Sequence, residues 1–256
     1  MNASSSAADL AELLGRAYQD KTTVRLPAAL EPADLQAAFA LQPRLLQRCG
    51  LATGGWKIGA KSPDGPIQGA PLPQTRIYSS AAAIARRDYP VLGLELEVYF
   101  VLDRDFGPQD RPVPEREVLA SIASFGAAIE IVSSRISGWP DAPKLSQLAD
   151  LQNNGALIVG SSVDYRSYRS DFPFAAPRLA FSLAGVPLTA GPARNPAGDP
   201  RRLLSWLVNH CRASGLSLPA GSIITTGSYT GLELPAQAGT VCGEIAGLPA
   251  VCCELV

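Results

Sequence analysis

The most regular pattern of apolar and polar positions in the chain lies between Leu94 and Val101. Apolar residues alternate there with Glu95, Glu97 and Tyr99. A period of two is that of a β-strand, whose successive side chains point to opposite faces. We therefore predict a strand with one apolar face and with two carboxylates, about 7 Å apart, on the other. A divalent cation such as Mg²⁺ would remove their repulsion, and a solvated polar face is the alternative.

Helical periodicity prevails at the start of the chain. A first helix is predicted through residues 8–18, with Ser5 or Ser6 as its cap. A second is predicted from near Pro32 to about Cys49, with Asp34 in its first turn and Gly50 as its stop. Pro43 falls inside this helix and is expected to kink or divide it.

Strand-like patterns prevail from Ile77 onward, after a first strand at Gly55–Gly59. Further helices are predicted at 115–124, 145–151 and 200–214, and the last of these is capped by Asp199 and ends at Gly215. Further strands are predicted at 127–132 and 155–160, on both sides of Gly185, and at 223–228, 240–245 and 250–256. The pattern predicts the α+β class, with a mainly helical N-terminal part at 1–76 and a β-rich catalytic domain at 77–256.

Composition excludes several functions. The 256 residues are 46% hydrophobic and carry a net charge of −1, which gives no basic surface for nucleic acid or membrane. There is no apolar run of membrane-spanning length and no signal-peptide pattern, so we expect a cytoplasmic protein. The five cysteines form no C-x-x-C pair and are expected to be free thiols in a reducing cytosol. A single histidine, His210, disfavours a zinc site.

Four residues in strand-like segments are candidates for chemistry, namely Lys57, Glu95, Glu97 and Glu130. Three carboxylates can hold a metal ion, and the metal can hold the carboxylate and keto oxygen of a substrate. A lysine beside them can donate or accept a proton, or stabilise an enolate by its charge. The alternatives are a surface lysine at position 57 and a Glu130 carboxylate that pairs with Arg135.

Several segments resemble one family in the correct order along the chain. They are Gly55-Trp56-Lys57-Ile58-Gly59 with Ser62, Leu94-Glu95-Leu96-Glu97, Ile129–Ile136 with Trp139, Ala149-Asp150 with Gly155, Asn195-Pro196, Trp206-Leu207 with Asn209, Ala220-Gly221 and Thr226-Gly227-Ser228. From about Phe39 to the C-terminus the chain resembles the 2-keto-4-pentenoate hydratases and oxalocrotonate decarboxylases of the fumarylacetoacetate hydrolase superfamily.

The resemblance implies a helical N-terminal part packed on a mixed β-roll of the fumarylacetoacetate hydrolase type. It implies Mg²⁺ or Mn²⁺ bound by Glu95, Glu97 and Glu130, and Lys57 in the same pocket. It also implies that Thr226, Gly227, Ser228 and Arg135 bind the substrate. The expected partners are a small 2-oxo or 2-hydroxydienoate and further copies of the same chain in a homo-oligomer.

The chain also departs from the family pattern. Ser133 replaces an aspartate, Leu151 an asparagine, and Asn153 and Asn154 the serines that follow it; Leu96 replaces the proline between the strand glutamates. The predicted metal ligands are kept while the polar groups around them change. Such changes tune the orientation and basicity of the metal ligands. We therefore still expect the fold of the family, whereas the identity of the substrate stays open.

Three functions remain open. The first is a metal-dependent lyase of aromatic or related carbon catabolism, either a hydratase that adds water to a 2-hydroxydienoate or an oxalocrotonate decarboxylase, which would need an additional contact for a second carboxylate. The second is an acylpyruvate C–C hydrolase, which is expected to use a histidine base. His210 lies in an amphipathic helical run, where packing is expected instead. The third is a non-catalytic relative.

Overall fold

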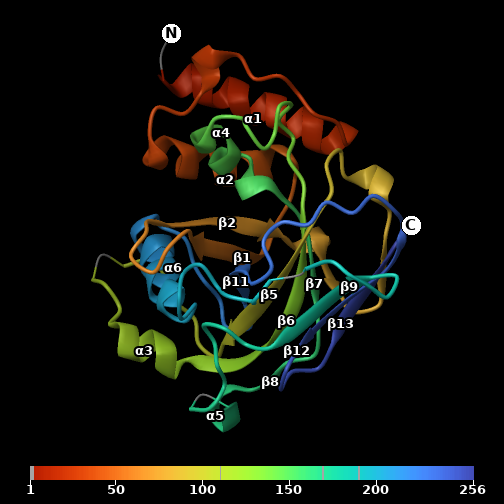
Figure 1. Cartoon of the computed structure of the whole chain (residues 1–256). Helices are drawn as coiled ribbons and strands as arrows, with labels where there is room; N and C mark the ends of the chain where they lie inside the picture. The colour runs from red at the N-terminus through yellow and green to blue at the C-terminus, as the bar shows by residue number, and fades with distance from the viewer. Residues whose placement is uncertain (1–2, 110, 169, 190) are drawn as a thin grey trace.

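The computed structural model describes residues 3–109, 111–168, 170–189 and 191–256 (Figure 1). Its α-helices are α1 (Ala3–Asp20), α2 (Leu35–Arg48), α3 (Glu115–Ala120), α4 (Lys144–Ala149), α5 (Tyr165–Tyr168) and α6 (Arg202–Ala213). Its strands are β1 (Thr53–Ala60), β2 (Ile67–Pro73), β3 (Ile77–Ser79), β4 (Ala82–Ile84), β5 (Gly93–Leu102), β6 (Ile122–Val132), β7 (Asn154–Val159), β8 (Val163–Asp164), β9 (Leu179–Leu183), β10 (Val186–Pro187), β11 (Ile223–Ser228), β12 (Gly239–Ile245) and β13 (Val251–Leu255).

Two mixed β-sheets form the body of the protein. The larger, eight-stranded sheet has the order β2-β1-β11-β5-β6-β7-β3, with β8 paired to β6. Strand β1 runs parallel to β11, and β5 runs antiparallel to both β11 and β6. The five-stranded sheet has the order β10-β9-β12-β13-β4. These sheets with a few helices confirm the predicted α+β class.

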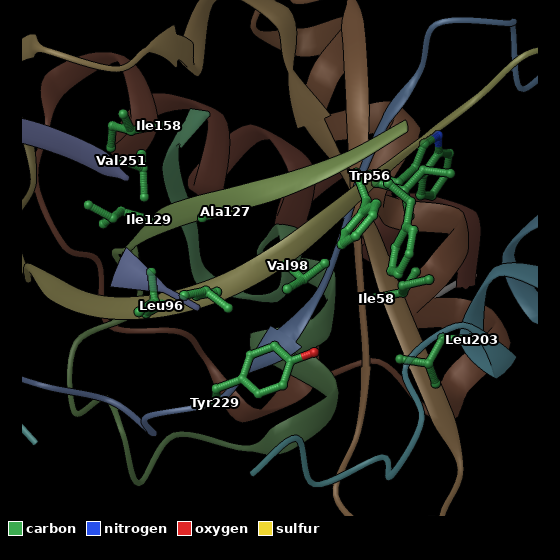
Figure 2. Packing of buried hydrophobic residues seen from close by; sticks show 14 of the residues in the cluster. Trp56, Ile58, Leu96, Val98, Ala127, Ile129, Ile158, Leu203, Tyr229 and Val251 are labelled. Carbon is green, nitrogen blue, oxygen red and sulfur yellow. The ribbon is translucent and has the colours of Figure 1, made fainter. Parts of the chain in front are cut away.

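The main hydrophobic core lies on the apolar face of β5. Leu94, Leu96, Val98 and Phe100 are all fully buried, as the alternation predicts. Figure 2 shows Val251 of β13, which belongs to the smaller sheet, near Ile129 of β6, and the same core cluster contains these residues and Leu96. A Cβ at Gly243 of β12 would lie 2.3 Å from Leu96 Cδ1, so a larger residue there would force the Leu96 side chain to move where the two sheets approach.

A second hydrophobic cluster joins helices α1, α2 and α4, which lie together beyond β2 in Figure 1. Leu14, Leu45 and Leu148 are buried in it, and so is Ala70 of β2. Ala70 is the cross-strand partner of Lys57 on β1, and directly paired residues share one face of a sheet. The helical layer therefore packs on the face of the sheet to which Lys57 belongs.

Strands β1 and β2 fall within the first 76 residues but pair into the eight-stranded sheet, whereas α1 and α2 belong to the helical layer. The division at 76/77 remains a prediction. Among the described residues, no helix combines the length and apolar character needed to cross a membrane.

Several predicted features of the helices differ in the structure. The helix predicted at 115–124 ends at Ala120, and Ile122 already pairs with Leu102 of β5. The apolar positions there fit both the helical and the strand period, and hydrogen bonding between β5 and β6 makes the segment a strand. Asp34 is the N-cap of α2 and accepts a hydrogen bond from Ala37 N at 2.8 Å, so it precedes the first turn. Pro43 lies inside α2 without dividing it.

The prediction that all five cysteines are free is wrong. Cys242 and Cys252 form a disulfide between β12 and β13, where the two residues are direct cross-strand partners. Cys49, Cys211 and Cys253 are free. The two cysteines are 10 residues apart in sequence, and their pairing depends on the register of the consecutive strands β12 and β13, which spacing alone does not reveal.

Candidate active site

Three carboxylates meet on the face of the large sheet opposite the main core. Glu95 of β5 and Glu130 of β6 are direct cross-strand partners, and Glu97 follows two residues along β5 on the same face. One oxygen from each carboxylate lies within 4.8 Å of the others. The structure therefore brings together the three glutamates that the sequence marked as metal ligands.

Burial and mutual repulsion act on the protonation of this cluster. Glu97 and Glu130 are buried, and Glu95 is partly exposed. Burial, reinforced by the charge of Glu130, raises the pKa of Glu95 to about 7. Burial and the charges of Glu130 and Glu95 raise the pKa of Glu97 to about 8. The carboxylates are therefore costly to ionise together, and a cation among them would remove that cost.

The end of β11 holds the Glu97 carboxylate in place. Glu97 Oε2 accepts hydrogen bonds from Thr225 Oγ1 and, at 3.0 Å, from the backbone N of Gly227. The β5–β11 ladder is irregular between Thr225 and Ser228, and Gly227 there has a φ of 92°. A residue with a side chain rarely adopts this conformation, so glycine allows the backbone to turn its N–H toward the carboxylate.

Lys57 of β1 reaches the same cluster. Its Nζ donates to Glu130 Oε1 at 2.6 Å and to the backbone oxygen of Gln152 at 3.0 Å. Burial alone would lower the pKa of Lys57, but the charges of Glu130, Glu95 and Glu97 outweigh it and raise that pKa. Lys57 is therefore a charged ammonium, and only neutralisation of the carboxylates would bring its pKa down.

One oxygen of Glu130 remains open. Glu130 Oε1 accepts from Lys57 and, at 3.3 Å, from Asn154 Nδ2, whereas the buried Oε2 has no hydrogen-bond partner within the described part of the chain. Buried carboxylate oxygens are normally satisfied. An unsatisfied oxygen in a cluster of three carboxylates fits a hard divalent cation, which prefers oxygen ligands.

The residues predicted to bind substrate lie in different surroundings. Thr226 is buried, and its hydroxyl donates to Val98 O at 2.8 Å. Gly227 contacts Glu97 through its backbone N–H, as described above. Ser228 is the cross-strand partner of Glu97, is partly exposed, and donates from Oγ to Gly231 O at 3.1 Å. The Ser228 hydroxyl is therefore the side-chain group of this triplet on the carboxylate face.

Arg135 is engaged in a buried ion pair. Its Nε donates to Asp150 Oδ1 at 2.6 Å, and its remaining guanidinium hydrogen bonds end on the backbone oxygens of Asp150 and Asn154. Burial raises the pKa of Asp150 despite this cation. A direct contact between Arg135 and substrate, which the resemblance implied, would require one of these hydrogen bonds to break.

Sequence reasoning missed several groups that shape the site. Thr225, the backbone oxygen of Gln152 and Asn195 were not singled out as site groups; Asn195 Nδ2 donates to the oxygens of Thr226 and Gly227 at 2.9 and 3.1 Å. The Thr-Gly-Ser motif pointed to the correct strand end but not to the threonine before it. A backbone acceptor leaves no signal in a single sequence.

The His210 ring lies among aromatic side chains and not among the three glutamates. Its ring stacks on Trp206 with centroids 4.7 Å apart and lies 4.6 Å from that of Phe39. It lines a mainly apolar cavity of about 610 Å³ between α2 and α6, and the residues that line this cavity include none of the three glutamates. The packing role expected for His210 agrees with these contacts.

Known proteins resemble the chain at moderate identity. It is 29% identical over 233 residues to the TodF product hydratase of Pseudomonas putida, covering 85% of this chain and 83% of that protein. It is 26% identical to a 2-keto-4-pentenoate hydratase of Burkholderia vietnamiensis over 98% of both chains. No protein-family model matches.

The fold is shared with a solved structure of 4-oxalocrotonate decarboxylase from Pseudomonas putida G7, in complex with magnesium and adipate. The TM-score is 0.84 at 17% identity, and the match covers 100% of this chain and 99% of the other. Together with the relatives, this confirms the resemblance to 2-keto-4-pentenoate hydratases and oxalocrotonate decarboxylases within the fumarylacetoacetate hydrolase superfamily. The relatives support an enzyme of the hydro-lyase type.

Proposed function

We propose that the chain is a Mg²⁺- or Mn²⁺-dependent hydratase that adds water to a 2-hydroxydienoate or its 2-oxoalkenoate tautomer, in aromatic or related carbon catabolism. The observation that carries the proposal is the meeting of Glu95, Glu97 and Glu130 beside the charged Lys57. The names of the curated relatives, which include several 2-keto-4-pentenoate hydratases, support this choice of substrate.

In this proposal the three glutamates hold the cation, and Glu130 Oε2 is available to it because no other group occupies that oxygen in the described structure. A bound Mg²⁺ or Mn²⁺ supplies Lewis-acid polarisation of the 2-oxo group. Thr225 and Gly227 keep the Glu97 carboxylate directed into the cluster. The network fixes the ligands before substrate arrives, which lowers the cost of reorganisation.

Lys57 holds its proton at Nζ beside the site where the substrate's 2-oxygen would become an enolate. Hydration proceeds when the dienol loses its hydroxyl proton, gains a proton at the terminal carbon to give the conjugated ketone, and then takes up water at the far alkene carbon. A fixed ammonium stabilises the negative charge that develops on the oxygen. The Ser228 hydroxyl, on the same face as Glu97, is the side chain we assign to hydrogen bonding with substrate or water.

A decarboxylase is the second candidate, because the solved structure with the same fold is an oxalocrotonate decarboxylase. Its substrate carries a second carboxylate, which would need a further cationic or polar partner. Among the described residues, Lys57 is hydrogen-bonded to Glu130 and Arg135 to Asp150, so neither cation is uncommitted. Because both of these cations are already engaged, a second substrate carboxylate would lack a partner in them, which favours the hydratase over the decarboxylase.

Product analysis separates the two activities. Purified protein with Mg²⁺ is given 2-hydroxypenta-2,4-dienoate or 4-oxalocrotonate, and the products are identified by NMR and by release of carbon dioxide. We expect a 4-hydroxy-2-oxo acid from the first substrate and no carbon dioxide from the second. Carbon dioxide release from 4-oxalocrotonate, with no water addition to the dienoate, would replace the hydratase by the decarboxylase.

We also propose a homo-oligomer. The resemblance implies one, and Val186, Leu234 and Val256 expose 59%, 62% and 65% of their surface although they are apolar. Exposed apolar side chains mark a subunit interface where they gather into one contiguous patch. Sedimentation equilibrium at micromolar concentration is expected to give a multiple of the chain mass, and a mass near 26.8 kDa would contradict the proposal.

A further inference from the structure

The turn between α4 and β7 has an unusual backbone. Leu151, Gln152 and Asn153 have φ values of 48°, 53° and 57°, so three consecutive residues with side chains occupy the left-handed region. Such residues visit this region singly and at a cost in free energy. Strained backbone persists only where the surrounding structure over-determines it, and it is often found at functional sites.

Arg135 clamps both ends of this turn. Its guanidinium donates to the backbone oxygen of Asp150, before the turn, and to that of Asn154, after it. The Asp150 carboxylate accepts hydrogen bonds from the Arg135 backbone N at 2.8 Å and from its Nε at 2.6 Å. The clamp fixes the ends, but it does not contact the middle of the turn.

The middle of the turn is anchored by Leu151. Its side chain is fully buried in the cluster that α1, α2 and α4 form over the sheet. The next residue, Gln152, presents its backbone oxygen to Lys57 Nζ at 3.0 Å. Leu151 thus connects the core of the helical layer to the second acceptor of the catalytic ammonium.

That second acceptor has a distinct role. Glu130 Oε1 also contacts Lys57, but Glu130 is itself one of the three clustered carboxylates. The Gln152 oxygen is neutral and belongs to the backbone, so its hold on the ammonium does not depend on what the carboxylates bind. The lysine ammonium carries three donors on a flexible four-carbon stem, so a second acceptor further restricts its position.

We propose that Leu151 is a positioning residue for Lys57: its buried side chain holds the left-handed turn so that the Gln152 oxygen fixes the ammonium. The kinetic consequence rests on the proposed hydratase function, whereas the geometric claim does not. Leu151 is a departure from the family pattern, and the chain uses this apolar side chain as the anchor.

Chemical labelling tests the geometric claim without activity or metal. Metal-free protein is treated with acetic anhydride, and acetylation of Lys57 relative to the exposed Lys61 is followed by peptide mass spectrometry. We expect Leu151→Ala to raise the relative labelling rate of Lys57 at least fivefold. Leu148→Ala is the matched control, because Leu148 is 1% exposed in the same cluster and lies before the turn; it should change the rate less than twofold.

Two further variants keep the test decisive. Leu151→Met keeps an apolar side chain of similar volume and should restore protection of Lys57. Leu151→Asn tolerates the left-handed backbone but lacks the apolar anchor, so it separates the anchor from the strain of the turn, and it should expose Lys57. Equal labelling of Lys57 in the Leu148 and Leu151 variants, or unchanged labelling in Leu151→Asn, would overturn the proposal.

Kinetics provide the second readout. At saturating dienoate and Mg²⁺, and well below the unfolding temperature, Leu151→Ala should lower kcat at least tenfold with KM changed less than threefold, while Leu148→Ala stays within twofold of the parent. Equal losses of kcat in both variants would show a merely structural role. If the parent has no hydratase activity but labelling follows Leu151, the proposed function fails and the positioning claim stands.

Discussion

Glu95 and Glu130 lie directly opposite each other on the paired strands β5 and β6. Like charges in this relationship destabilise a sheet, and the third carboxylate, Glu97, adds to the repulsion. Lys57 is the one cation beside three carboxyl groups, and their crowding helps to raise the pKa of Glu95 to about 7 and that of Glu97 to about 8. The sheet therefore retains an arrangement that is unfavourable in the absence of a further cation.

Mg²⁺ binding is expected to raise the melting temperature. A ligand that binds only the folded state at one hundred times its Kd stabilises it by about 2.7 kcal/mol. Glu97→Gln should abolish this shift because it removes a ligand charge with little change in size. The exposed Glu31→Gln should keep the shift, and an equal shift in both variants would place the cation elsewhere. Differential scanning fluorimetry with and without Mg²⁺ makes the comparison.

Lys57→Met is expected to lower kcat by more than tenfold, which corresponds to more than about 1.4 kcal/mol of barrier. The variant should bind Mg²⁺ more tightly than the parent, because a positive charge is removed from beside the carboxylates. Steady-state kinetics and calorimetric titration measure the two effects. Lys61→Met, at an exposed position, is the control. Turnover within tenfold of the parent would show that Lys57 is not catalytic.

His210 is expected to contribute to acid sensitivity. Burial lowers the pKa of His210 below 6.5, so the unfolded chain binds a proton as the pH falls through 6.5 while the folded protein does not. Stability therefore decreases from that pH toward the lower folded pKa. His210→Phe keeps an aromatic ring against Trp206 and should flatten the dependence between pH 7 and 5. Identical pH dependence of the unfolding free energy in both proteins would contradict this.

The Cys242–Cys252 disulfide is expected to stabilise the smaller sheet. It closes a loop with a sequence separation of 10, and cross-linking such a loop removes unfolded-state entropy worth about 2–3 kcal/mol. Cys242→Ser should lower the free energy of unfolding accordingly under oxidising conditions, and a reductant should lower that of the parent alone. Thiol counting by mass spectrometry that finds five free cysteines in unreduced protein would show that the bond does not form.

The sequence allowed the main elements of the fold to be predicted because their periodicity is clear. Glu95 and Glu97 show their common face through alternation alone, and Glu130 lies in an equally apolar segment. Around Ile122 the apolar residues fit both the helical and the strand period. Pairing of β6 with β5 makes this segment a strand, so the predicted helix was too long.

The remaining features depend on contacts that a single sequence does not encode locally. Partnership of Arg135 with Asp150 requires the turn that brings β6 and α4 together. The acceptor at Gln152 is a backbone oxygen, and its direction comes from a left-handed conformation that Leu151 and Gln152 do not favour. The disulfide likewise follows from strand register.

The requirement for a metal held by the three glutamates is tested most directly by metal add-back. Protein stripped with a chelator is mixed with 2-hydroxypenta-2,4-dienoate, and loss of the dienol absorbance is followed as Mg²⁺ or Mn²⁺ is added, for the parent and for Glu130→Gln. We predict that the parent consumes the dienol only when metal is present and that Glu130→Gln, which keeps an amide beside Lys57, does not respond. Full turnover by metal-free parent, or an undiminished metal response in Glu130→Gln, would contradict the account.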